Sequence, residues 1–145
     1  MSGFLHSTYP PDPGAEIRRW VLDDPTQLLP LRGDLRIIAS GRLAPQDADD
    51  GMLAEGLMLV ATELASNVFK HATPPATVLL RHAAGSVVLD VADHDPLVEP
   101  AYAVASGHRG HGGRGLHLAR RLATDLGWYA TDDTKHVWAR FAFPG

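Results

Sequence analysis

The feature that most constrains the fold is residues 46–70, a long and uninterrupted helical pattern. One face of this helix is apolar, so another layer of the protein must cover it. The helix must end near residues 72–75, because Pro74 and Pro75 follow it and a residue before proline avoids helical angles. The apolar residues of this face are Leu57, Val60, Ala61, Leu64 and Val68.

The same helix carries a second, polar row. Glu63, Asn67 and His71 recur every four residues, so a helix places them one above another on a single face. A carboxylate can act as a general base, and an amide oxygen can bind a hard cation such as Mg²⁺. An ordinary solvated polar face has the same pattern, so this stretch alone does not distinguish a site from a surface.

Composition limits the class of protein. A chain of 145 residues suits one domain with a substantial core. Its net charge of −4 gives no overall basic surface, so direct nucleic-acid binding is not expected. The absence of cysteine excludes disulfides, thiolate metal sites and cysteine nucleophiles. We find neither a signal peptide nor an apolar run of about 20 residues, so we expect a cytoplasmic protein without a membrane span.

The order of the elements predicts the architecture. Residues 1–14 are rich in proline and are expected to form a flexible tail, and residues 15–145 a single domain. We expect an α+β two-layer sandwich, in which a mixed, mostly antiparallel sheet carries its helices on one face. Leu122 of the last helix should face inward, and Arg121 should face solvent. The predicted elements are a strand at 16–22, a helix from about 25 to 40, the helix 46–70, a hairpin of strands 76–82 and 86–92, a helix at 115–126 that ends at Gly127, and strands at 128–130 and 136–143.

A glycine-rich segment, residues 107–115, is the second candidate site. Glycines let backbone amides approach a phosphate, and the amino terminus of the following helix offers further free amides. Arg109 and Arg114 add charged donors. No Gly-Lys-Ser or Gly-Lys-Thr follows, and the segment does not open a βαβ unit, so neither a Walker loop nor a Rossmann site fits. A flexible surface loop is the alternative.

Asp93, at the end of the second hairpin strand, is the third candidate. Its carboxylate could accept a hydrogen bond from an amino group of a ligand, although Asp and Pro are also common in ordinary turns. A histidine-based metal site is a further alternative, but the spacings do not match a zinc protease. The histidines concerned are His71, His94, His108, His111 and His117.

Taken in order, these motifs resemble the ATP-binding domain shared by DNA gyrase, sensor histidine kinases and heat-shock chaperones. The chain is most similar to the small stand-alone anti-sigma factor serine kinases of bacteria, of the actinobacterial type. The ending Val137-Trp138-Ala139-Arg140-Phe141 is also similar to that group. The resemblance covers about residues 16–143 and implies a Bergerat-type ATP-binding fold.

The resemblance implies a role for each candidate residue. Asn67 matches the ligand of a Mg²⁺ ion that bridges the ATP phosphates, and Glu63 the catalytic carboxylate that polarises a serine hydroxyl. Asp93 matches the acceptor of the adenine amino group. His71 is either a neighbour of the phosphates or a structural hydrogen-bonding group. The phosphate-binding turn would comprise Gly112, Gly113, Arg114, Gly115 and Leu116, beneath a lid of residues 98–112.

The resemblance also implies partners and a regulatory role. ATP and Mg²⁺ are the expected cofactors, and a sigma factor and an anti-sigma antagonist protein are the expected partners of a homodimer. The chain departs from the family pattern at Asp95 and Leu97, where glycines are usual, and at His136, where a threonine often precedes Val137. These departures leave open an alternative, a binding module of the same fold that is catalytically weak or inactive.

Overall fold

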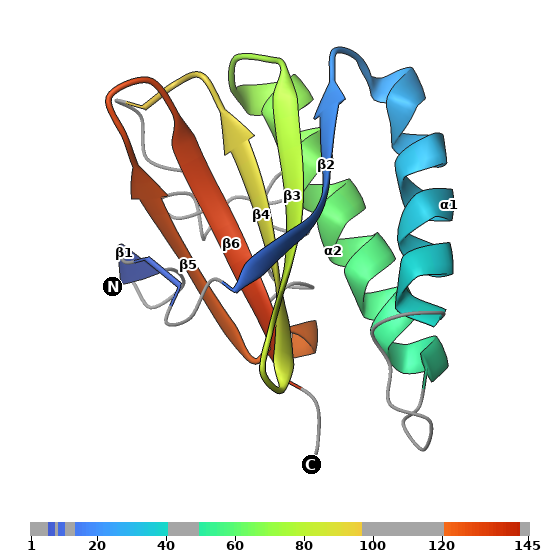
Figure 1. Cartoon of the computed structure of the whole chain (residues 1–145). Helices are drawn as coiled ribbons and strands as arrows, with labels where there is room; N and C mark the ends of the chain where they lie inside the picture. The colour runs from blue at the N-terminus through green and yellow to red at the C-terminus, as the bar shows by residue number, and fades with distance from the viewer. Residues whose placement is uncertain (1–5, 8, 11–13, 41–49, 97–120, 143–145) are drawn as a thin grey trace.

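The computed structural model describes residues 6–7, 9–10, 14–40, 50–96 and 121–142. Its elements are β1 (His6–Ser7), β2 (Ala15–Leu22), a short 3-10 turn η1 (Pro25–Gln27), α1 (Leu28–Ile38), α2 (Asp50–His71), β3 (Ala76–Ala83), β4 (Ser86–Asp93), β5 (Asp125–Ala130) and β6 (Lys135–Ala142). The strands form one sheet in the order β1-β5-β6-β4-β3-β2, with α1 and α2 on one face (Figure 1). Neighbouring strands are antiparallel except β1 and β5. The predicted α+β two-layer sandwich is confirmed.

Helix α2 is the element that joins the two layers. It lies against β3, β4 and β6 on one side and against α1 on the other. All five residues of its predicted apolar face are buried in the core. Covering a side chain of this size stabilises the fold by roughly 1.5–3 kcal/mol relative to leaving it in water. The strands that α2 covers contribute residues such as Val78, Leu80, Leu89 and Ala139 to the same core.

The 3-10 turn η1, which leads directly into α1, begins where the sequence predicts a helix start, near residue 25. The backbone N–H of Thr26 donates to the Asp24 carboxylate at 2.8 Å, and Gln27 Oε1 accepts from the backbone N–H of Asp24 at 3.2 Å. This reciprocal arrangement is a capping box, with Pro25 in the first turn. The hydroxyl and amide of Thr26 lower the pKa of Asp24 below its ordinary value.

A carboxylate on α1 connects this helix to β2. Asp34 Oδ2 accepts from the indole Nε1 of Trp20 at 2.9 Å and from the Arg18 guanidinium at 3.2 Å. Both donors belong to β2. The hydrogen bond satisfies the indole of Trp20, whose ring is part of the core. Asp34 therefore fixes α1 over the β2 edge of the sheet.

The predicted hairpin is present as β3 and β4. Ala83 pairs with Ser86, so the connection narrows to the two residues Ala84 and Gly85. Gly85 has φ = 77°, a left-handed conformation that favours glycine. Strand β4 is buried along its whole length and ends at Asp93, as the sequence predicts.

The end of the third predicted helix is wrong. The helix was expected to run to Leu126 and to end at Gly127, but both residues lie in β5, and only Arg121 and Leu122 are helical in this described part. Gly127 pairs across the sheet with Trp138, and a Cβ on it would lie 2.5 Å from the indole ring. Glycine is thus required here by a cross-strand aromatic ring, and does not act as a helix stop.

Side-chain exposure in this segment agrees only partly with the prediction. Arg121 is exposed, as expected, but Leu122 is 37% exposed rather than buried. The segment predicted as a tail also contains structure, because β1 pairs with β5 and the Tyr9 ring stacks on Tyr129 at a centroid distance of 4.2 Å. None of the helices among the described residues is long and apolar enough to cross a membrane.

Candidate functional site

Asn67 is the most informative residue of the predicted polar row. It lies on α2, and only 8% of it is exposed. Its amide nitrogen Nδ2 is buried and has no hydrogen-bond partner among the residues that the structure describes. A buried polar atom without a partner costs roughly 1–3 kcal/mol, so such atoms are rare unless a ligand or ion completes them. Rotation about χ2 exchanges the amide nitrogen and oxygen, so the same group can offer an oxygen to a cation.

The other two members of the row lie one turn before and one turn after Asn67. Glu63 is half-buried, and His71 is exposed in the last turn of α2. The helix thus places a carboxylate, an amide and an imidazole on one face, separate from the buried stripe of Leu64 and Val68. The arrangement can place an oxygen ligand beside a general base.

Asp93 lies at the same end of the domain as the carboxyl end of α2. The backbone N–H of His94 donates to the carbonyl oxygen of Thr73 at 3.1 Å, which ties the end of β4 to the chain just after α2. Asp93 is 5% exposed, and its Oδ1 accepts from the backbone N–H of Asp95 at 2.7 Å. The structure therefore brings two of the predicted segments, 63–71 and 93–95, to one edge of the sandwich.

The carboxylate of Asp93 also has a cationic partner that the sequence analysis missed. Lys135 Nζ lies 3.5 Å from Asp93 Oδ2, and the two side chains are 5% and 7% exposed, respectively. Lysine is rarely buried to this extent unless it is paired. Burial raises the pKa of Asp93 above its ordinary value, while the Lys135 cation and the Asp95 amide act in the opposite direction.

The sequence analysis singled out His136 of β6, which stands where a threonine often precedes Val137. In the sheet register, however, Lys135 is opposite Asp93, and His136 is opposite Ala92. Side chains alternate between the faces of a strand, so Lys135 shares the face of the core residue Val137. His136 points to the other face, away from the helices.

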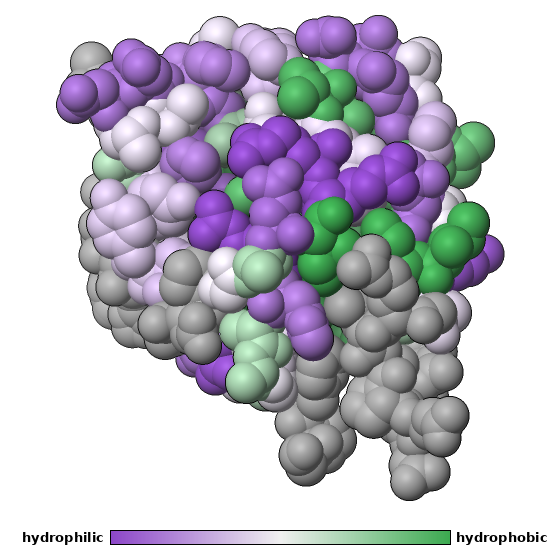
Figure 2. All heavy atoms as spheres, viewed as in Figure 1, coloured by the Kyte–Doolittle hydropathy of each residue, from purple (hydrophilic) through white to green (hydrophobic). Residues whose placement is uncertain are grey.

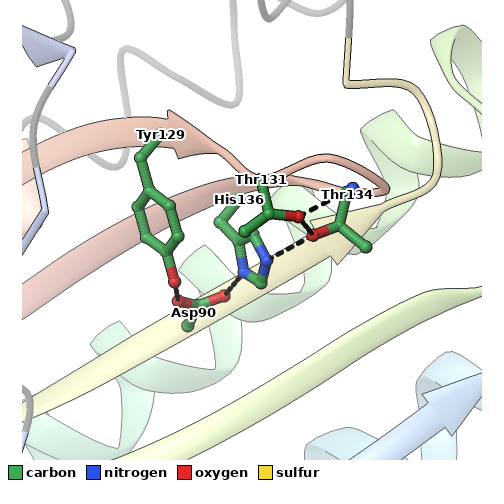
Figure 3. A network of polar contacts seen from close by, with 5 residues as sticks. All are labelled: Asp90, Tyr129, Thr131, Thr134 and His136. Carbon is green, nitrogen blue, oxygen red and sulfur yellow. Dashed lines mark hydrogen bonds and ion pairs between the residues drawn. The ribbon is translucent and has the colours of Figure 1, made fainter.

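His136 belongs to a polar network on that other face (Figure 3). Its Nδ1 lies 2.7 Å from Asp90 Oδ1, and its Nε2 lies 2.8 Å from the Thr134 hydroxyl. Tyr129 donates to Asp90 Oδ2 at 2.9 Å, and its ring stacks on the imidazole at a centroid distance of 4.5 Å. Burial, and then the charge of Asp90, raise the pKa of Tyr129 above its ordinary value. This network satisfies the buried Asp90 and lies on the sheet face opposite Asp93 and Lys135.

The predicted phosphate-binding turn lies outside the described residues. This applies to Gly112, Gly113, Arg114, Gly115 and Leu116, to the predicted lid at 98–112, and to Leu97. Within the described part of the chain, the candidate site consists of Glu63, Asn67, His71, Asp93 and Lys135. Within the same part, no three His, Asp or Glu side chains gather as a metal site, and His108, His111 and His117 fall outside it.

Comparisons with known proteins identify the family and the fold. Residues 22–141 match the model of a family described as the histidine kinase-like ATPase domain. Among solved structures, the chain is similar to the Acinetobacter baumannii histidine kinase AdeS, with a TM-score of 0.52 and 13% identity, over 89% of this chain and 69% of that one. At this level of identity, the likeness shows the fold alone. A search of curated proteins finds no match.

The unpartnered amide of Asn67 leads to a stability prediction. The substitution Asn67→Leu removes a buried group whose hydrogen bonding is incomplete, so the free energy of unfolding should rise by about 1 kcal/mol. Thr62→Val is the matched control, because the Thr62 hydroxyl on the same helix already donates to the Met58 carbonyl oxygen at 2.7 Å. Urea denaturation measures the change in the free energy of unfolding for both variants. A loss of about 2 kcal/mol or more for Asn67→Leu would show that the amide is satisfied within the protein.

Proposed function

The chain belongs to the family of histidine kinase-like ATPase domains, and from this premise we propose that it is an ATP-binding anti-sigma regulatory protein. In this proposal it transfers the γ-phosphoryl group of ATP to a serine of an anti-sigma antagonist, and it sequesters a sigma factor. The observation that carries the nucleotide part is the buried Asn67 amide nitrogen, which has no partner in the described part of the chain and lies at the same edge of the domain as the buried carboxylate of Asp93.

The residues present fit a magnesium nucleotide. Mg²⁺ prefers oxygen ligands and keeps several waters, so one amide oxygen from Asn67 together with phosphate oxygens suits it. Asp93 offers an acceptor for an amino group on a base. A bound magnesium nucleotide would supply the transferable phosphoryl group, and its Mg²⁺ ion would neutralise the charge that develops on that group.

Glu63 is the proposed catalytic residue. It lies one helical turn before Asn67 and is half-buried, so it is held beside the proposed metal ligand but remains accessible to a hydroxyl from a partner protein. Its carboxylate would accept the proton of that serine hydroxyl. A positioned base typically contributes about 10²–10⁴-fold to a reaction rate.

A second candidate function is a binding module that has weak or no catalytic activity. The departure from the family pattern at Asp95, where a glycine is usual, favours it. Asp95 adds a second negative charge beside the site, which opposes a triphosphate. This alternative predicts partner binding that does not depend on ATP or on Glu63.

The surface proposed for a protein partner or a second copy of the chain lies on α1. Leu29 and Ile37 are each 72% exposed, although they are large and apolar. A surface cavity of about 320 Å³ on this helix is lined by Leu29, Arg32, Gly33, Arg36 and Met58. Figure 2 shows hydrophobic residues towards the α1 side of this view, beside a mainly hydrophilic middle. Exposed apolar residues that border arginines are typical of a protein interface.

The catalytic role of Glu63 is tested by Glu63→Gln, which keeps the size of the side chain but removes the base. Phosphoserine formation from labelled ATP, in a nucleotide-depleted extract of the source cells, should fall by about 10²–10⁴-fold. Calorimetry should show unchanged ATP binding. Glu55→Gln is the control, because Glu55 is an exposed glutamate on the same helix. Equal labelling by the wild type and Glu63→Gln, or no labelling by either, would favour the binding module.

The α1 surface is tested by Ile37→Asp. A charge placed at this exposed apolar residue should weaken self-association, because it must lose its water when the surface is covered. Sedimentation at several protein concentrations should show a dimer for the wild type and a shift to monomer for the variant. Val21→Asp makes the same change at an exposed residue of β2 and should leave the dimer intact. A wild-type monomer at all concentrations would remove the homodimer from the proposal.

A further inference from the structure

The ion pair between Asp93 and Lys135 has an unusual setting for a structural salt bridge. It joins the last residue of β4 to the first residue of β6, which are register partners. Both side chains are more than nine-tenths buried, at 5% exposed for Lys135 and 7% for Asp93. A pair removed from water in this way often contributes little or no net stability, because the cost of desolvation offsets the attraction. Its position therefore invites a functional explanation.

The pair lies on the side of the sheet that carries the candidate site. Strand alternation puts Asp93 on the face of the core residues Leu89 and Val91, and Lys135 on the face of Val137, towards α2. The backbone hydrogen bond from His94 to Thr73 brings this end of β4 to the carboxyl end of α2. The buried charges thus lie at the same edge of the domain as the unpartnered amide of Asn67.

The pair presents an acceptor and a donor side by side. The carboxylate of Asp93 accepts hydrogen bonds, and the ammonium of Lys135 is a donor group with three N–H bonds and no acceptor. Their separation of 3.5 Å is longer than the roughly 2.7–2.9 Å of a tight charge-assisted hydrogen bond. The edge of adenine has the complementary pattern, with a donating 6-amino group next to the accepting ring nitrogen N1. Guanine has the reverse order at these two positions.

We propose that Lys135 is a base-recognition residue that donates to N1 of adenine while Asp93 accepts from the 6-amino group. The proposal rests on the proposed function, namely that this site holds ATP. In this proposal the buried lysine contributes to base specificity, and the ion pair of Asp93 and Lys135 selects adenine over guanine. Lys135 then contacts the nucleotide itself and does more than hold Asp93 in place.

The test compares ATP with 1-deaza-ATP, in which a C–H group replaces N1. Calorimetry with Mg²⁺ should show that the wild type binds 1-deaza-ATP about 10- to 100-fold more weakly than ATP, the usual value of a hydrogen bond to a charged group. In Lys135→Met, ATP should bind more weakly by a similar factor, and the preference for ATP over the analogue should fall to about one.

Removing only the lysine leaves a buried carboxylate without its cation and can prevent folding. The double variant Asp93→Asn with Lys135→Met removes both charges, and Asp93→Asn alone is its reference. The amide oxygen of asparagine still accepts from the 6-amino group. The preference for ATP over 1-deaza-ATP should be present in Asp93→Asn and absent from the double variant.

The outcomes separate this proposal from the one on which it rests. If ATP binds but the wild type does not distinguish it from 1-deaza-ATP, base recognition by Lys135 is wrong and the ATP site stands. The same conclusion follows if the preference survives the removal of Lys135, because the lysine then acts only as the structural partner of Asp93. If the wild type binds neither nucleotide, the proposed function fails and this inference fails with it.

Discussion

The packing of α2 on the sheet is the interaction on which the rest of the structure depends. The buried face of this helix covers β3, β4 and β6, so its position fixes where its polar face can lie. The direction of Asn67 and Glu63 on α2 is fixed because Leu64 and Val68 of the same helix are held in the core. The hydrogen bond from the His94 N–H to the Thr73 carbonyl oxygen then joins the segment after β4 to the segment after α2. Side chains on a helix that is anchored in this way are held more precisely than side chains on a loop.

The candidate site combines groups whose burial is costly. Asn67 leaves an amide nitrogen without a partner, and Asp93 and Lys135 remove two charges from water. Proteins commonly retain such costly groups where a ligand stabilises them. Buried polar groups that are incompletely satisfied therefore indicate a candidate ligand site. By contrast, the buried Asp90 on the opposite face is fully engaged by Tyr129 and His136 and shows how this fold satisfies a carboxylate that has a structural role.

The sequence predicted the elements whose signals are local. The helical pattern of α2, the hairpin of β3 and β4 and the helix start near residue 25 each depend on nearby residues, and all three were predicted. Gly127 was misread because the reason for glycine there is Trp138, a residue on the neighbouring strand. The partner of Asp93 was missed for a similar reason. Counting the alternation of β6 back from Val137 would have placed Lys135 on the site face, but only the register shows that it meets Asp93.

The most direct test of a nucleotide site at this edge is an NMR titration. The protein, labelled with ¹⁵N, is titrated with Mg²⁺ and a non-hydrolysable ATP analogue, and the side-chain NH₂ signal of Asn67 is followed together with the backbone amides of Asp93 and His94. The account predicts that these signals shift together and saturate, while the amides of Arg19 and Val21 on β2 stay unchanged. An Asn67 signal that does not move at saturating analogue, or shifts confined to β2, would contradict it.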